Sequence, residues 1–262
     1  MVKVLLRGGK VGMEIRPLYF EKAFGLSVRN ARIISFGACN FSCPYCKREG
    51  QFRVDDGSIV SARDCGLDDL YRVCDDAHDQ GQVIRLSGGD PVVFPKESLA
   101  IAEYMRARYG EKISMAHNGS SPAFAARIAP FLESAAIDLK ALPAEMNLRA
   151  GLKNGSGERM FYRSLETHNV LASSGVRVDV RTPIFGTTTL DDMLAMAKHI
   201  ILGGKLEMKF WTWRLYKHVR GCDWPTPHQG QVLWMIQEVK KVHPELRIGL
   251  RAKWEPSGFM YF

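Results

Sequence analysis

Short apolar runs alternate with longer amphipathic segments along most of the chain. Six of the runs are rich in apolar and β-branched residues and are bounded by turn signals, which is typical of buried strands. They span residues 33–36, 83–87, 113–116, 136–140, 176–183 and 206–212. Segments with helical spacing follow them at residues 62–80, 97–109, 122–133, 159–172, from Thr189 to near Gly203, and 229–242. This order of strand and helix, repeated six times with short connections, predicts a parallel sheet with helices outside it.

The leading architecture is therefore an α/β fold, an open or closed (β/α) barrel with six strand–helix units. We expect residues 1–30 to form an N-terminal cap or hairpin and residues 31–213 the barrel core. Residues 214–262 are expected to form a C-terminal helix–strand extension of the same domain that covers the substrate side. No internal repeat or linker indicates a second domain. In barrels of this kind the chemistry lies at the carboxyl ends of the strands.

Composition adds little to this expectation. Of 262 residues, 46% are hydrophobic and 24% are charged, as in ordinary globular proteins. No apolar run approaches the ~20 residues that a membrane-spanning helix needs, and the N-terminal apolar segment is too short for a secretory signal. We therefore expect a cytoplasmic protein without a membrane partner. The formal charge of +8 leaves room for an acidic partner or nucleic acid, but a basic, well-solvated surface is the favoured explanation.

Three of the six cysteines, Cys39, Cys43 and Cys46, lie in one loop directly after the first predicted core strand. The other three are scattered, so the set does not resemble a disulfide framework. Structural zinc sites use four protein ligands, and iron–sulfur clusters usually have four thiolates. Three thiols without an obvious fourth favour a metal centre that leaves one position open for a substrate. A zinc site completed by a remote ligand, or three unrelated cysteines, are the alternatives.

The spacing Cys39-x3-Cys43-x2-Cys46 after a strand, with Tyr45 before the last cysteine, resembles the cluster motif of the radical S-adenosylmethionine (radical SAM) superfamily. The resemblance implies a partial (β/α)6 barrel of the radical SAM type and a [4Fe–4S] cluster on the three cysteines. The remaining iron would bind the amino and carboxylate groups of S-adenosylmethionine. The resemblance also implies an anaerobic oxidoreductase that cleaves S-adenosylmethionine to a 5′-deoxyadenosyl radical, with electrons from a reductant such as flavodoxin or ferredoxin.

A second segment, Gly88-Gly89-Asp90-Pro91, follows the second predicted core strand. Paired glycines let a backbone approach a ligand closely because they lack a Cβ. The segment resembles the glycine–glycine–acid–proline segment with which the family contacts the methionyl amino group. The acid is Asp90 in place of the more frequent Glu, so the contact could rest on backbone carbonyls instead of the side chain. Taken alone, the segment would be read as a tight turn.

Further polar residues fall where predicted strands end or face inward. Tyr45 is expected to place its backbone against the adenine, or else to pack the loop. His117 and Asn118 are candidates for a cofactor contact or a structural role. Asp138 and Lys140 alternate along one strand and so share a face, where two opposite charges are costly unless they pair or bind a ligand. Arg181 could bind the cofactor or a substrate carboxylate, or form a salt bridge.

The Asp138-Leu139-Lys140 segment and the form of the cysteine loop look most like the activating enzymes of pyruvate formate-lyase and anaerobic ribonucleotide reductase. The resemblance implies hydrogen abstraction from a glycine of a partner protein, which is the leading expectation. The alternative is epimerisation, rearrangement or ring formation on a small molecule or peptide. Cys222 could then be a catalytic hydrogen donor, although an inert buried cysteine is the other interpretation. A remote alternative is a nucleic-acid-binding protein with a structural metal site, suggested by the basic residues at 214–220.

Overall fold

Six parallel strands form the centre of a curved mixed sheet, and they lie side by side in the order in which they occur along the chain. They are β4 (Asn30–Phe36), β8 (Val83–Gly88), β9 (Ile113–His117), β10 (Leu132–Asp138), β11 (Arg177–Ile184) and β12 (Lys209–Leu215). The structure is a computed structural model. It describes residues 1–7, 10–46, 52–53, 59–60, 62–153, 155–217, 222–252 and 258–262.

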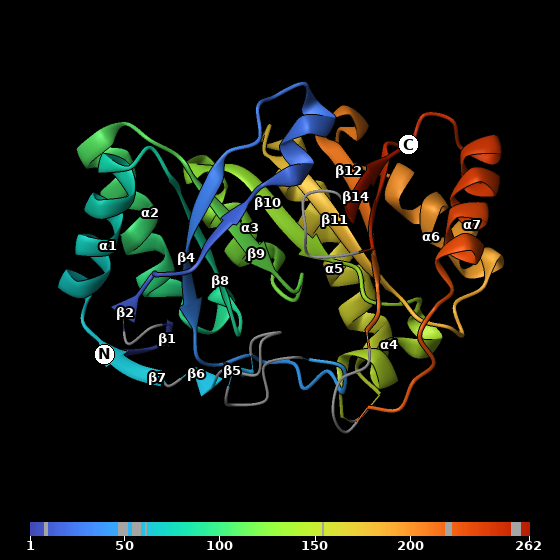
Figure 1. The fold of residues 1–262 in the computed structure, drawn as a ribbon, viewed down its shortest axis with the longest axis horizontal. Coiled ribbons are helices and arrows are strands. Elements are labelled where there is room, and N and C mark those ends of the chain that lie inside the picture. The colour runs from blue at the N-terminus through green and yellow to red at the C-terminus, as the bar shows by residue number, and fades with distance from the viewer. Residues whose placement is uncertain are drawn as a thin grey trace.

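A helix follows each of these strands and covers the convex side of the sheet (Figure 1). The six helices are α1 (Leu67–Asp79), α2 (Pro95–Tyr109), α3 (Pro122–Ile128), α5 (Gly157–Ser173), α6 (Leu190–Ile201) and α7 (Gln229–Val242). In the described part of the chain, no helix is both long enough and apolar enough to cross a membrane. This arrangement confirms the predicted partial (β/α)6 barrel.

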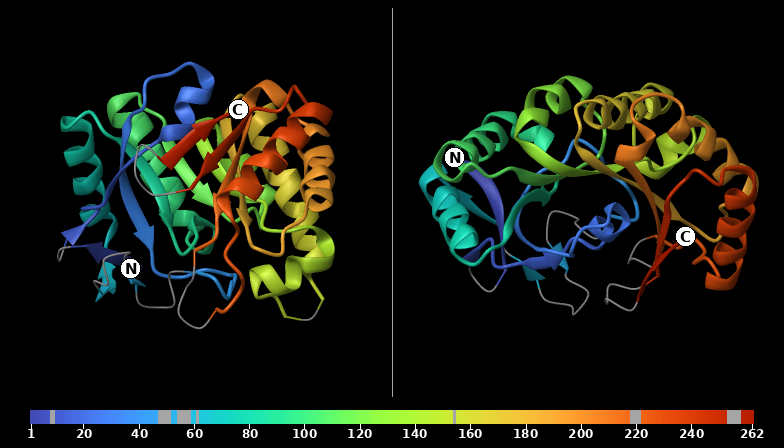
Figure 2. Two further views of the ribbon diagram at one scale, coloured as in Figure 1. Left: turned by 45° about the vertical axis from the view of Figure 1, so that its right-hand side comes forward. Right: turned by 90° about the horizontal axis from the view of Figure 1, so that it is seen from above.

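Other strands extend the sheet at both edges. At one edge, β13 (Ile248–Arg251) runs parallel to β12 and β14 (Phe259–Tyr261) runs antiparallel to β13. At the other, β1 (Val2–Arg7) pairs antiparallel with β4, and β2 (Lys10–Val11) and β7 (Ala62–Cys65) pair with β1. Among the described residues the two edges do not pair with each other, so the sheet is an open arc (Figure 2).

Shorter elements complete the described chain. The strand β3 (Ile15–Pro17) pairs with β4, and it leads into the 3-10 helix η1 (Tyr19–Phe24) on the concave side of the arc (Figure 2). The strands β5 and β6 pair only with each other. The remaining elements are β5 (Phe52–Arg53), β6 (Ile59–Val60), η2 (Pro91–Val93), η3 (Ala129–Phe131), α4 (Pro143–Ala150) and η4 (Leu206–Met208).

Several local predictions were wrong. Residues 206–208 were expected to begin a strand, but they form η4 and the strand begins at Lys209. Residues 62–65 were expected to begin a helix, but they form β7, which pairs with β1 from Val2–Cys65 to Leu5–Ala62. Residues 132–133 were expected to end a helix, but they begin β10. The helix α4 was not predicted. The partner of β7 lies about sixty residues earlier in the chain, so periodicity within the segment contains no signal for its pairing.

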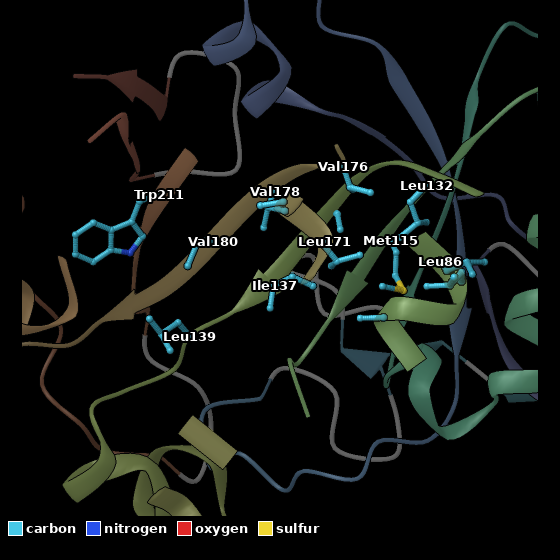
Figure 3. Packing of buried hydrophobic residues seen from close by; sticks show 14 of the residues in the cluster. Leu86, Met115, Leu132, Ile137, Leu139, Leu171, Val176, Val178, Val180 and Trp211 are labelled. Atoms are coloured by element: carbon cyan, nitrogen blue, oxygen red, sulfur yellow. The ribbon is translucent and has the colours of Figure 1, made fainter. Parts of the chain in front are cut away.

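The two faces of the sheet differ in composition because successive side chains of a strand point to opposite faces. Side chains on the convex face are apolar and pack against the helices (Figure 3). Fully buried examples are Leu86, Met115, Ile137, Val178, Val180 and Trp211. Side chains on the concave face are mostly polar or charged and line a cavity, as do Arg85, Ser87, Asp179, Arg181, Thr212 and Arg214. The hydrophobic core therefore lies between sheet and helices, and the inside of the barrel is left for a site.

Candidate active site

A cavity of about 350 Å³ occupies the concave side of the sheet. The cysteine loop lines it at the carboxyl ends of the strands, and inward-facing side chains of β8, β11 and β12 line its wall. Segment 12–20, which includes β3 and the start of η1, also lines the cavity, as does Phe259 of β14. The cavity therefore extends from the predicted cluster site into the interior of the barrel.

Most of the predicted site residues meet at this cavity. The three cysteines line it, and so do Tyr45, Gly88, Gly89, Asp90, His117, Asn118, Asp138, Lys140 and Arg181. These residues come from the ends or inward faces of four strands, β8, β9, β10 and β11, and from the cysteine loop. Pro91 and Cys222 do not line the cavity. Pro91 is buried and begins η2.

The cysteine loop begins at the end of β4 and extends across the bottom of the molecule in Figure 1, where it approaches α4, the helix that was not predicted. The amide of Ser42 donates a hydrogen bond to the carbonyl of Ala150, the last residue of α4, at 3.2 Å. Within the loop, the amide of Cys46 donates to the carbonyl of Cys43 at 2.9 Å. Cys39 is exposed and the other two cysteines are partly buried. The loop thus presents all three thiols to one cavity, from a backbone that is bonded to α4 at Ser42 and to itself between Cys43 and Cys46.

The end of β8 and the cysteine loop are in backbone contact. The amide of Gly89 donates to the carbonyl of Phe36 at 2.6 Å, and the amide of Asp90 donates to the carbonyl of Ala38 at 2.8 Å. A Cβ on Gly89 would lie 1.9 Å from the carbonyl oxygen of Ala38, and Gly88 has a φ of +102°, which side chains rarely allow. The paired glycines are therefore required by the approach of the loop itself, whether or not a ligand also lies against them.

The carboxylate of Asp90 is engaged within the protein. It accepts hydrogen bonds from the amides of Asn118 at 2.7 Å and Val92 at 3.0 Å, and it lies 2.7 Å from Nδ1 of His117. Asp90 is only 2% exposed. The side-chain amide of Asn118 also donates to Sγ of Cys39 at 3.7 Å. This network favours the alternative in which the segment contacts an amino group through backbone carbonyls, because the Asp90 side chain already binds the end of β9.

Asp138 and Lys140 form an ion pair at the cavity, with 2.7 Å between Oδ2 and Nζ. Burial alone would lower the pKa of Lys140, but attraction to Asp138, and then to Cys43 and Tyr45, holds that pKa well above its usual value. Burial raises the pKa of Cys43, and the Lys140 ammonium opposes that shift. The lysine therefore adds a fixed positive charge beside the cysteine loop, as a group that stabilises thiolates would.

Tyr45 belongs to an aromatic cluster beside the loop. Its ring centroid lies 5.2 Å from that of Phe185, 5.9 Å from Trp224 and 6.4 Å from Tyr216. Cys222 packs in the same cluster, is 4% exposed, and accepts a hydrogen bond from the Tyr216 hydroxyl at its carbonyl oxygen (2.8 Å). The position of Cys222 favours the packing role over hydrogen donation, because its thiol is enclosed by aromatic rings away from the cavity.

Sequence reasoning missed several charged residues of the cavity wall, namely Arg16, Arg85, Asp179, Arg214 and Arg251. A signal was present: each arginine of β8 and β12 occupies an inward position of a strand whose neighbouring residues are apolar. Arg181 was predicted, and its Nε donates to Oδ2 of Asp179 at 2.6 Å. Of the basic stretch at 214–220, Arg214 and Lys217 line the cavity, and residues 218–220 lie outside the described part of the chain.

Comparison with known proteins identifies the family. Residues 33–200 match the sequence model of the radical SAM superfamily. The chain belongs to this superfamily. Radical SAM proteins use a [4Fe–4S] cluster and S-adenosylmethionine, so the predictions of superfamily and cofactors are confirmed.

Two curated relatives match parts of the chain. A 7-carboxy-7-deazaguanine synthase of Methanothermobacter thermautotrophicus is 27% identical over 184 residues, which cover 68% of this chain and 70% of that protein. A probable GTP 3′,8-cyclase of Methanothermobacter marburgensis is 34% identical over 90 residues, which cover 34% of this chain and 27% of that protein. Neither is named as a glycyl-radical activating enzyme, so the finer prediction of an activase has no support from them.

Solved radical SAM structures share the fold. A radical SAM methyltransferase from Sphaerobacter thermophilus superposes with a TM-score of 0.60 at 12% identity, over 88% of this chain and 69% of that one. SuiB of Streptococcus suis, bound to the precursor peptide SuiA, gives a TM-score of 0.59 at 12% identity over 84% of this chain and 48% of that one. At these identities the likeness concerns the fold alone.

The donor set of this chain fits the radical SAM cofactors. Three thiols of one loop line a single cavity, which is the ligand number that leaves one iron of a cluster open. Among the described residues, no three His, Cys, Asp or Glu side chains converge on one ion position. A cluster does not require such convergence, because each thiolate binds a different iron. Nε2 of His117 is buried beside the cavity and has no hydrogen-bond partner in the described structure, so it is available to a bound cofactor.

Proposed function

We propose that this radical SAM enzyme acts on a small molecule held inside its barrel, and not on a glycine of a partner protein. One observation carries the proposal: the cavity continues from the cysteine loop to the polar inner wall formed by β8, β11 and β12. Segment 12–20 and Phe259 of β14 also line it. A small molecule bound there would lie beside the cofactor and be contacted by several strands at once, as ligands in concave sites usually are.

The residues of the chain divide into three roles under this proposal. Cys39, Cys43 and Cys46 would hold the cluster. The segment Gly88–Pro91, with His117 and Asn118, would hold S-adenosylmethionine, and the Asp138–Lys140 pair would fix charge beside it. When bound, the cluster and S-adenosylmethionine supply the radical that abstracts a hydrogen atom. The inner wall would orient the substrate and exclude water from it.

The curated relatives support a small-molecule substrate. Both are named for chemistry on small heterocycles, a 7-carboxy-7-deazaguanine in one and GTP in the other. SuiB, in contrast, was solved with a peptide, but its likeness to this chain concerns the fold alone. The expected product class is therefore a modified metabolite, and glycyl-radical activation, the leading expectation from the sequence, is left as an outcome of the test below.

The test begins with anaerobic reconstitution of the cluster, followed by reductant and S-adenosylmethionine and measurement of 5′-deoxyadenosine. An extract of the source organism is then separated into a protein-free metabolite fraction and a protein fraction, and each is added in turn. We expect the metabolite fraction to raise the yield of 5′-deoxyadenosine above the uncoupled level, and Cys43→Ala to abolish the yield. Stimulation by the protein fraction alone would favour the activase, and an intact cluster without any cleavage would refute radical SAM activity.

A further inference from the structure

The inner wall of the barrel carries an excess of positive charge. Among the described lining residues, seven are cationic and four are carboxylates. The cationic residues are Arg16, Arg85, Lys140, Arg181, Arg214, Lys217 and Arg251, and the carboxylates are Glu14, Asp90, Asp138 and Asp179. We call Arg85, Arg181, Arg214 and Arg251 the arginine cluster. They come from four different strands, β8, β11, β12 and β13, whose inner faces meet at the cavity.

The four carboxylates of the wall already have partners. Asp179 accepts hydrogen bonds from Arg181 and from the hydroxyl of Thr212. Asp138 pairs with Lys140 and Glu14 pairs with Arg16. The fourth, Asp90, binds His117 and lies at the carboxyl end of the strands. The carboxylates are therefore bound to particular groups, and among the described lining residues the cations still outnumber them.

Arg85 is the most buried member of the arginine cluster and has an unused donor. The residue is 4% exposed, and its Nη1 donates to Oγ of Ser114 at 3.3 Å. Its Nη2 is buried and has no hydrogen-bond partner among the described residues. The guanidinium carbon lies 6.0 Å from the ring centroid of Phe20, which supports one face of the group. A buried cation with an unsatisfied donor is costly, and an anion bound in the cavity would remove that cost.

The arginines also repel one another. The pKa of Arg85 is lowered well below its usual value by burial and then by Arg181. The pKa of Arg214 falls to about 10 for the same two reasons, and that of Arg251 falls to about 9 through burial, Arg214 and Arg181. A guanidinium nevertheless keeps its proton near neutral pH. The cost therefore persists as repulsion between like charges, which a negatively charged ligand would relieve.

The cofactor does not account for the arginine cluster. In S-adenosylmethionine, an ammonium and a sulfonium outweigh the single carboxylate, so the molecule brings further positive charge. Arg85 also lies three residues before Gly88 on β8, about 10 Å along the strand from the backbone that contacts the cysteine loop. Arg85 is thus set back from the expected cofactor position, at the depth where a substrate would lie, and Arg181, Arg214 and Arg251 line the same cavity nearer the carboxyl ends of their strands.

We propose that the substrate carries at least one oxyanion group, a carboxylate or a phosphate, which Arg85 and Arg214 bind with help from Arg181 and Arg251. Guanidinium groups bind such oxyanions through two parallel hydrogen bonds, which fix orientation as well as charge. The anionic end would point into the barrel and the reacting end toward the cysteine loop. This inference rests on the proposed function, because it names the class of small molecule that the site accepts.

The test is a calorimetric titration of reconstituted holoenzyme, saturated with S-adenosylmethionine and kept without reductant so that no cleavage occurs. Malonate and pyrophosphate are the probes, and malonamide is the uncharged match for malonate. We expect at least one anion to bind and malonamide not to bind. Arg85→Gln should weaken the binding about tenfold, the size expected for loss of one charge-assisted contact. Arg163→Gln, on the exposed surface of α5, is the matched control and should leave the affinity unchanged.

The visible absorbance of the cluster shows whether each variant is folded and loaded, and Arg214→Gln replaces Arg85→Gln if the latter does not fold. Binding of malonate alone identifies a carboxylate site, and binding of pyrophosphate alone identifies a phosphate site. Equal binding of malonamide, indifference to both substitutions, or anion binding only in the absence of S-adenosylmethionine would overturn the proposal. Anion binding without 5′-deoxyadenosine formation would instead refute the proposed function and leave the anion site standing.

Discussion

Along β8, Ile84 and Leu86 face the helices, whereas Arg85 and Ser87 face the cavity. The same alternation recurs on β11, where Val178 and Val180 are fully buried in the core and the residues between and after them line the cavity. The two faces are built from the same strands with the same period of two residues. They differ only in chemical character, and that difference separates the residues that hold the fold together from those available for binding.

The separation is sharpest on β12. Trp211 and Trp213 point outward and have no exposed surface, whereas Thr212 and Arg214 point into the cavity. Burial of apolar surface on the convex face supplies most of the stabilisation. Because of this, the concave face can carry charges that would be unacceptable in a core. Substitutions on the convex face should therefore lower stability and spare chemistry, and those on the concave face should do the reverse.

The largest effect on activity is expected from substituting one of two cysteines, of which one lies on the concave side of the sheet and the other on the convex side. Cys43→Ala removes a cluster ligand from the cavity, so iron loading and 5′-deoxyadenosine formation should fall to background. Cys74→Ala, at a fully buried position of α1 on the convex side, should leave both unchanged and lower the free energy of unfolding by about 1 kcal/mol. For each variant, the measurements are its iron content, its yield of 5′-deoxyadenosine and its free energy of unfolding by chemical denaturation. Full activity in Cys43→Ala would remove the basis for assigning the loop to the cluster.

The next effect concerns the convex face alone. Trp211→Ala deletes a fully buried side chain and its hydrogen bond from Nε1 to the hydroxyl of Thr182 (2.9 Å), so the free energy of unfolding should fall by about 3–5 kcal/mol. Trp234→Ala, at a position of α7 that is 49% exposed, is the control and should cost less than about 1 kcal/mol. Denaturation curves give both values. Similar losses in the two variants would contradict the assignment of the core to the space between sheet and helices.

The same contrast explains what the sequence predicts well. The apolar convex face repeats every second residue within each strand, and the helices repeat with their own period, so local pattern was enough to predict six strand–helix units. The cysteine loop and Gly88-Gly89-Asp90-Pro91 were found because fixed spacings identify them. Their positions at the strand ends followed from the architecture, since parallel strands present their carboxyl ends together.

What was missed depends on contacts between distant segments. The strand β7 exists because it pairs with β1, and its own residues, Ala62 to Cys65, also suit a helix. The arginine cluster was missed for a related reason. Within its own segment, Arg85 is a single charged residue in an apolar strand. Only the way the strands lie side by side shows that Arg181, Arg214 and Arg251 line the same cavity. Local periodicity cannot supply that register.

A smaller effect is expected where the two faces meet, at the end of β8. Gly89→Ala would place a Cβ 1.9 Å from the carbonyl oxygen of Ala38, so the loop backbone must shift. We expect a loss of about 1–3 kcal/mol in the free energy of unfolding and reduced iron loading. Gly66→Ala, where a Cβ meets nothing within 4 Å, is the matched control. If Gly89→Ala loads iron normally, the contact between strand and loop does not position the cysteines.

The smallest effect lies in the helical layer. Asp75 of α1 accepts hydrogen bonds from the hydroxyls of Tyr104 and Tyr109 of α2, both at 2.7 Å, and these bonds hold the pKa of the carboxyl below its usual value. A folded pKa below the unfolded one stabilises the fold above about pH 4, and the stabilisation is lost as the pH falls through the folded pKa. Because Asp75 is partly exposed and screened by solvent, Asp75→Asn should cost less than about 1 kcal/mol at neutral pH.

The test compares the free energy of unfolding of the original protein and of Asp75→Asn, both without iron, between neutral and acidic pH. The difference between the two free energies should shrink as the pH falls. The reason is that the protonated carboxyl of the original protein then resembles the amide of the variant. A difference that grows in acid would mean that the tyrosine bonds do not favour the ionised carboxylate. After reconstitution, Asp75→Asn should form 5′-deoxyadenosine at the unchanged rate. This charge lies among the helices of the convex side, so it contributes to the contact between α1 and α2, whereas a charge on the concave side such as Arg85 contributes to binding.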